Sequence, residues 1–134
     1  MNLRTLIHTR LTSDAPLVAM VGDRIAQGSS VNDPPTRPFL IHRLLNSAAE
    51  GGKLGESRYL QFWAHDEPGD YQKIDDILAR VKLVMIGTTS FQELLEITWI
   101  EDSQDFRDND FGTICRYSRY QAVFTTRERM DPWT

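Results

Sequence analysis

The chain has 134 residues, a length typical of one domain, and its 15 basic and 19 acidic residues give a net charge of −4. This charge argues against a free-standing DNA-binding protein, which would carry a basic stripe. No stretch approaches the ~20 apolar residues that span a bilayer, and the N-terminus lacks the pattern of a secretory signal peptide. The single cysteine, Cys115, excludes an intrachain disulfide and a cysteine metal cluster. We therefore expect an intracellular protein, or one made in the cytosol, without membrane contact.

The N-terminal part predicts two helices and a short strand. Residues 2–13 place apolar side chains on one helical face, with Arg10 inside that arc. Ser13 and Asp14 begin a second short helix, whose first turn holds Pro16 and which ends at Gly22. Residues 23–26 predict a short edge strand, and the polar segment 27–37 predicts a loop.

A hairpin with a long connection follows. Residues 39–45 and 58–65 are predicted strands, and the glycine-rich segment 46–57 (NSAAEGGKLGES) is a predicted flexible connector between them. Loops of this length inside a compact domain are usually functional or disordered. We expect this one to be mobile in the free protein and ordered when the chain is bound in an assembly. It lacks the spacing of a phosphate-binding P-loop.

The stretch from Arg58 to Gly87 organises the chain as a strand, a turn at residues 66–69 and an amphipathic helix. Asp70 is the predicted N-cap and Gly87 the predicted C-cap. Asp76 and Arg80 have the spacing of an exposed helical ion pair. The core-facing stripe consists of Ile74, Ile77, Leu78, Val81, Val84 and Met85.

A second apolar strip, made of Ala79, Leu83 and Ile86, lies nearly opposite that stripe on the same helix. Two explanations are open. Either the helix frays before Leu83 and these residues bend into the core, or the strip is a subunit interface.

The C-terminal part predicts two further strands at residues 93–101 and 113–126, joined by an acidic turn at 102–112. Residues 127–134 form a polar tail. Because no strand–helix–strand unit repeats, we expect a single α+β domain over residues 1–126. It consists of a mostly antiparallel sheet of four main strands packed against two or three helices.

The residues predict no catalytic, metal or cofactor site. Of the three histidines, His42 and His65 lie on the predicted hairpin, but two histidines without a third ligand make a poor zinc site, and His8 lies elsewhere. The acidic turn lacks the ligand order of a calcium-binding EF-hand. Cys115 reads as a buried, inert thiol, and no Gly-x-Ser-x-Gly motif is present.

The aromatic residues of the strands are interpreted as core or interface positions and not as a base-stacking platform, because the net charge is negative. They are Tyr59, Trp63, Trp99, Tyr117 and Tyr120.

The order of these motifs resembles the tail-completion or tail-terminator proteins of long-tailed bacteriophages. The similarity includes the opening LRTLIHTRLTSDAPLVAMVGDRI and the proline-containing loop before PFLIHRL. It continues through YLQFWAHDEPGDY and IDDILARVKLVM and covers nearly the whole chain. The acidic turn and the glycine-rich connector depart from the commonest pattern of the family.

The resemblance implies a structural protein without catalytic residues. Members of this family form a ring, usually six-fold, that caps the tail tube and joins it to the head. The implied partners are further copies of the chain, the tail tube protein and a head-completion or connector protein, with double-stranded DNA passing through the ring. The implied location is the neck region of a virion assembled in the host cytoplasm. The alternatives are another neck or tail adaptor, such as a head-completion or minor tail protein, and a small-molecule-binding or hydrolytic α+β domain.

Within this resemblance, the acidic turn has an expected place. Asp102, Asp105, Asp108 and Asp110 crowd one short connection, in which only Arg107 offsets them. We expect this turn to face the DNA channel, where fixed negative charge keeps phosphates from binding. The alternative is an outer rim where the charge aids solubility.

Overall fold

The computed structural model describes residues 3–28, 36–50, 55–86 and 94–124. The chain begins with α1 (Leu3–Thr12), α2 (Ala15–Val21) and β1 (Ile25–Gln27). The remaining elements, in chain order, are β2 (Phe39–Glu50), β3 (Gly55–Asp66), α3 (Gln72–Ile86), β4 (Leu94–Asp102), β5 (Phe106–Asp108) and β6 (Thr113–Phe124). Residues 127–134, the predicted polar tail, and Gly87, the predicted C-cap, lie outside the described residues.

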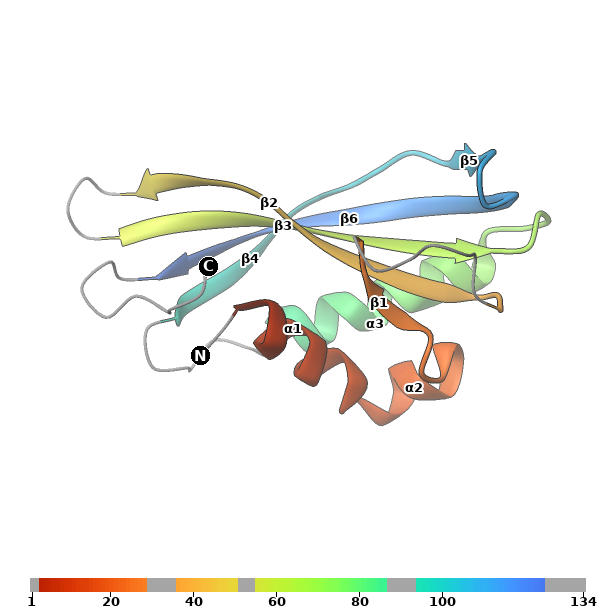
Figure 1. The fold of residues 1–134 in the computed structure, drawn as a ribbon, viewed down its shortest axis with the longest axis horizontal. Helices are drawn as coiled ribbons and strands as arrows, with labels where there is room; N and C mark the ends of the chain where they lie inside the picture. The colour runs from red at the N-terminus through yellow and green to blue at the C-terminus, as the bar shows by residue number, and fades with distance from the viewer. Residues whose placement is uncertain (1–2, 29–35, 51–54, 87–93, 125–134) are drawn as a thin grey trace.

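The sheet has the order β1-β2-β3-β6-β4, with β5 pairing β6 beyond the end of β4. Every pairing is antiparallel except that of β1 with β2. The three helices lie together on one side of the sheet (Figure 1). The fold is therefore α+β, as predicted, with β1 and β5 as short additions to the four main strands.

The core lies between the helices and one face of the sheet. Alternate residues of β2, β3 and β6 point toward the helices, because successive side chains of a strand alternate between faces. Leu40, Leu60, Phe62, Tyr120 and Ala122 are fully buried there. The predicted stripe of α3 is buried against them along its whole length.

Asp14 begins α2, as predicted, and also connects two helices. Its carboxylate accepts a hydrogen bond from the backbone N–H of Leu17 at 3.1 Å. Arg80 of α3 donates to both oxygens of the same carboxylate, at 2.8 Å each. The predicted pairing of Arg80 with Asp76 is therefore wrong. Asp76 instead accepts from Gln72 at 2.8 Å, because the approach of α2 offers Arg80 a bidentate partner.

The helix α3 starts two residues after Asp70. The Asp70 carboxylate accepts from the backbone N–H of Gln72 at 3.0 Å, so it still satisfies a free donor at the start of the helix. At the other end, α3 continues to Ile86 without fraying before Leu83.

The predicted connector 46–57 is largely strand. β2 continues to Glu50 and β3 begins at Gly55, so only residues 51–54 lie outside the described residues. The ladder between the two strands shifts its register between Leu44 and Ser47 and then resumes. The strand β3 is held on its other side by β6 along its length. Backbone pairing with β3 therefore outweighs the preference of this glycine-containing segment for a loop.

The predicted acidic turn 102–112 is not one turn. Asp102 ends β4, and residues 106–108 form β5 on the same edge of β6. Between them, the backbone N–H of Ser103 donates to the carbonyl of Tyr117 at 2.8 Å. The reversal of the chain is confined to residues 109–112, where Gly112 has a positive φ of 66°.

Candidate assembly surfaces

The second apolar strip of α3 faces solvent in the single chain. Ala79 is exposed, and the side chains of Leu83 and Ile86 are 64% and 48% exposed. These values exclude the explanation in which the strip bends into the core. Arg80 and Lys82 lie on either side of Leu83 around the helix and point toward α2 and β4 respectively.

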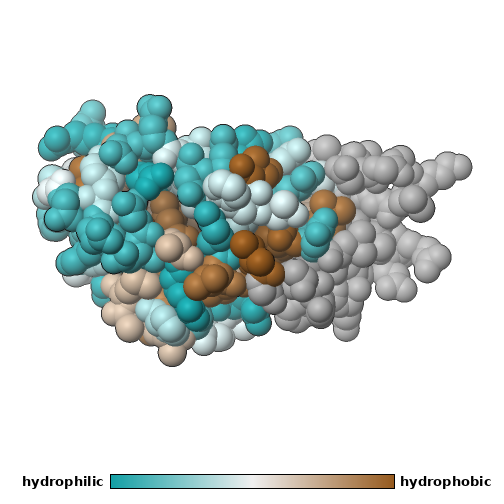
Figure 2. Space-filling model, turned by 180° about the vertical axis from the view of Figure 1, so that it is seen from behind, coloured by the Kyte–Doolittle hydropathy of each residue, from teal (hydrophilic) through white to brown (hydrophobic). Residues whose placement is uncertain are grey.

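The neighbouring strand β4 adds exposed apolar area. Trp99 and Ile100 are 40% and 39% exposed. The Lys82 ammonium lies 4.0 Å from the centre of the Trp99 ring and 3.8 Å from the Asp102 carboxylate, which connects α3 to β4. From behind, hydrophobic residues form a run across the middle of the molecule, bordered by hydrophilic ones (Figure 2).

The four aspartates of the acidic segment have different surroundings. Asp102 accepts hydrogen bonds from Ser118 at 2.6 Å and from the Trp99 indole at 3.0 Å. Burial raises the pKa of Asp102, whereas these hydrogen bonds and the nearby cations lower it. The net result is a pKa below the usual value of an aspartate. Asp105 lies 3.6 Å from Arg116, which also pairs with Asp75 of α3. Arg107 is therefore not the only cation that offsets this segment.

Asp108 and Asp110 lie near the tip of the β5–β6 connection. One oxygen of Asp108 accepts from the backbone N–H groups of Asp110 and Phe111, both at 2.9 Å, and so shapes the turn. Asp110 is exposed. Of the four predicted residues, these two are the ones without an ion pair among the described residues.

The side chains of His42 and His65 do not lie close together, although both residues belong to the β2–β3 hairpin. His42 points into the helix layer, where its Nε2 lies 3.0 Å from Nδ1 of His8 on α1. His65 points to the opposite face, stacks on Phe39 and contacts the Thr113 hydroxyl at 2.8 Å. Burial lowers the pKa of both His42 and His65 to about 4. In the described part of the chain no three potential ligands converge on a metal position.

The sheet face away from the helices carries an aromatic cluster that the sequence did not predict as one group. Trp63 lies 4.8 Å from Tyr117 and 5.8 Å from Phe106, measured between ring centres. Cys115, which lies on β6 with Tyr117, is buried, as predicted. Burial raises the pKa of its thiol to about 11. Trp63, Tyr117 and Phe106 lie on three different strands, so no spacing along the sequence relates them. Their pairing across strands depends on the register.

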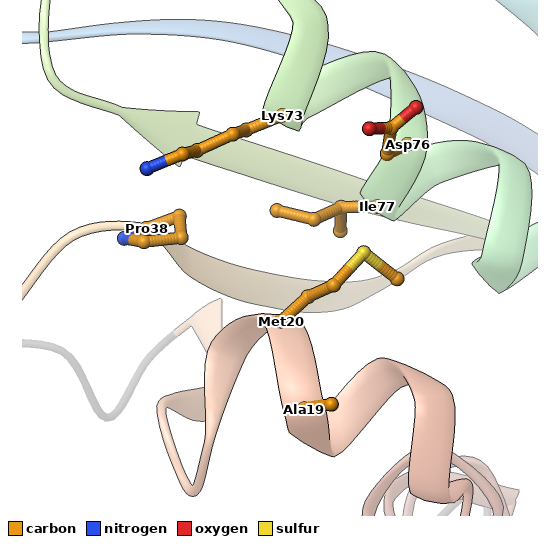
Figure 3. A pocket seen from close by; sticks show the side chains of 6 residues that line it. All are labelled: Ala19, Met20, Pro38, Lys73, Asp76 and Ile77. Atoms are coloured by element: carbon orange, nitrogen blue, oxygen red, sulfur yellow. The ribbon is translucent and has the colours of Figure 1, made fainter.

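The hollows that the described residues line are small. One of about 290 Å³ lies between α2, α3 and the start of β2, where Met20, Pro38 and Ile77 face one another and Lys73 and Asp76 border them (Figure 3). Another of about 270 Å³ lies on the open face beside Trp63 and Asp108. Both volumes lie at or below the lower end of the range for small-molecule sites. None of the described helices has the length and apolar character needed to cross a membrane.

No family model and no curated protein matches this chain. Solved structures do match. A chain of the virion of a native gene transfer agent particle aligns with a TM-score of 0.72 and 15% identity, over 92% of this chain and 95% of the other. The bacteriophage SPP1 gp17 protein aligns with a TM-score of 0.51 and 17% identity, over 94% and 89%. The chain therefore has the fold of a gene transfer agent virion component and of a bacteriophage protein.

Proposed function

We propose that this chain is a structural tail-terminator, or tail-completion, protein of a long-tailed bacteriophage or a related particle. In this role it forms a ring of six copies, the usual number in this family, that caps the tail tube and joins it to the head. The observation that carries the proposal is the shared fold with a virion component, which extends over nearly the full length of both chains. The order of sequence motifs supports the same role independently. The role is mechanical and requires no catalytic residue or cofactor.

The proposed contact between subunits includes the strip formed by Ala79, Leu83 and Ile86. Its support is the exposure of Leu83 and Ile86 on a helix that is ordered to its end. Covering one such side chain contributes about 1.5–3 kcal/mol, so a few of them make a substantial part of an interface. The remaining partners in the proposal are the tail tube protein and a head-completion or connector protein.

The proposed channel surface includes the acidic segment with Asp102, Asp105, Asp108 and Asp110. Asp108 and Asp110 support it best, because they lie at a hairpin turn and form no ion pair among the described residues. A negative channel wall repels phosphates and lets DNA slide. The net charge of −4 per chain favours the same behaviour.

Size-exclusion chromatography with light scattering tests the assembly. We expect a particle of about six times the 15.4 kDa chain mass, visible as a ring by electron microscopy. A protein that stays monomeric across the micromolar range, alone and with its tail tube protein, would contradict the proposal.

Particles assembled without this protein distinguish a terminator from other adaptors. A terminator predicts DNA-filled heads and separate tails, and expression of the intact chain in trans restores joining. A head-completion protein instead predicts heads that lose their DNA, and a minor tail protein predicts joined particles with an altered tail.

A further inference from the structure

The sheet has two open edges of similar length. β4 forms one edge over nine residues and pairs only with β6 among the described strands. At the other edge, β1 pairs with β2 only at Leu40–His42. The rest of β2, residues 43–50, has β3 on one side and no described strand on the other. Such edges present unpaired N–H and C=O groups that pair readily with another strand.

The two open edges lie at the same height along the sheet. When the paired residues are traced from β4 through β6 and β3 to β2, Trp99 is level with Leu44 and Leu94 is level with Ala49. At the other end of β4, Asp102 is level with His42 of β2, the last residue of β2 that pairs with β1. The strand β4 therefore ends at the height where β1 begins to cover β2. A copy placed beside the first therefore brings its β4 against the uncovered part of β2.

The strand directions also agree. β2, β3, β6 and β4 are each antiparallel to the next, so β4 runs opposite to β2. Copies related by rotation about an axis along the strands keep these directions. In that arrangement β4 of one copy meets β2 of the next as an antiparallel pair, the commoner pairing in sheets.

Charges match at one position of this pairing. Glu101 of β4 is level with Arg43 of β2, because Glu101 pairs with Arg119, Arg119 with Gln61, and Gln61 with Arg43. Arg43 is exposed and forms no ion pair within the described part of the chain, and Glu101 lies 3.9 Å from Arg119. Without a shift in register, Glu101 of one copy lies beside Arg43 of the next, on the sheet face away from the helices. Opposite charges directly across a strand pair stabilise it.

We propose that the occupant of these edges is a second copy of this chain, and that β4 of one copy pairs with residues 43–50 of the next. The inference rests on the proposed ring and specifies how it closes. The contact is heterologous, since it uses two different surfaces, and repeated contacts of this kind close into a ring when the rotation allows. It also continues the sheet from copy to copy and removes the exposed edges.

Cysteine crosslinking tests this contact in a Cys115→Ala background. Thr98 on β4 and Asn46 on β2 are both exposed and lie at nearly the same height. We expect that co-expressed Thr98→Cys and Asn46→Cys chains, treated with a flexible bismaleimide, give covalent dimers and nothing larger. A chain with both substitutions gives a ladder up to the full ring, and each single variant alone stays uncrosslinked.

Three outcomes overturn the inference. Crosslinking of Thr98→Cys alone shows a two-fold contact between β4 strands. A ring by light scattering without crosslinks in the mixed sample places the interface elsewhere and leaves the proposed function intact. A monomer at all concentrations, both alone and with the tail tube protein, removes both proposals.

A charge exchange gives a second readout on the assembled protein. We expect Glu101→Arg to raise the concentration of half-assembly about tenfold, and the added Arg43→Glu to restore it. Unchanged thermal melts of the separate chains show that folding is not the cause. If the double variant assembles no better than Glu101→Arg alone, the two residues do not face each other.

Discussion

At the residue scale, Asp14 shows how one side chain positions several elements. Its carboxylate holds the first turn of α2 and receives both hydrogen bonds from Arg80 of α3. The Arg80 guanidinium holds the pKa of Asp14 below its usual value. The pair fixes α2 against α3 at the surface beside Leu83, where a shallow hollow of about 230 Å³ lies. The outward strip of α3 is therefore presented by a fixed helix pair.

The buried histidines predict an acid-sensitive fold. The pKa of His42 and of His65 is about 4 in the folded chain, against 6.5 when exposed. The unfolded chain therefore binds protons first as the pH falls. Their stabilising contribution is complete above pH 6.5 and is lost toward pH 4. We expect the free energy of unfolding to fall by roughly 1 kcal/mol per histidine between pH 6.5 and 5.5, measured by urea titration.

His65→Gln provides the comparison for this effect, because glutamine can still bond Thr113. This variant should lose about half of the pH dependence between pH 6.5 and 5.5. The same slope in both proteins would show that His65 does not titrate in this window.

Leu83→Asp tests the outward strip. We expect it to weaken self-association at least tenfold, because it buries a charge at the proposed subunit contact. The melt of the separate chain should change by less than about 1 kcal/mol, since Leu83 is 64% exposed. Light scattering and thermal melts measure the two effects.

Ala19→Asp is the matched control, because Ala19 is an exposed apolar residue on α2 and the substitution changes the charge equally. It should leave assembly unchanged. Loss of cooperative unfolding in Leu83→Asp would place Leu83 in the core and refute the interface.

At the element scale, the segment 102–112 divides into a structural and a solvent-facing part. Asp102 and Asp105 are bound by Ser118, Trp99, Lys82 and Arg116, and their charges hold β4, α3 and β6 together. The turn at residues 109–112 instead projects beyond β5 and β6. Asp108 precedes this turn and Asp110 lies within it, and neither forms an ion pair among the described residues, so the proposed channel function depends chiefly on these two.

Replacing both Asp108 and Asp110 by asparagine tests whether this turn lines the channel. Asparagine keeps an oxygen that accepts the backbone hydrogen bonds, so the particles should assemble. We expect slower or incomplete DNA ejection, most marked at low salt, where screening is weakest. Asp23→Asn, at another exposed aspartate, should have no effect. Unchanged ejection at low salt from fully assembled particles would place the turn on the outer rim.

At the scale of the whole molecule, one curved sheet carries its helices on a single side (Figure 1). This arrangement leaves two edges and one face of the sheet for other contacts. The aromatic cluster around Trp63 partly covers the open face. The outer edges of β4 and of residues 43–50 of β2 have no partner among the described strands. A domain of this form is suited to repeat around an axis, which agrees with the proposed ring.

The sequence by itself determined the elements whose signal is local. The apolar stripe of α3, the start of α2 at Asp14 and the alternation in β3 follow from spacing along the chain, and the structure confirms them. The tertiary structure decided what depends on distant residues. It assigned Arg80 to Asp14, brought His42 to His8 and drew the glycine-rich connector into β2 and β3. Periodicity reports which face of an element is apolar, whereas partners and strand ends depend on packing between segments far apart in sequence.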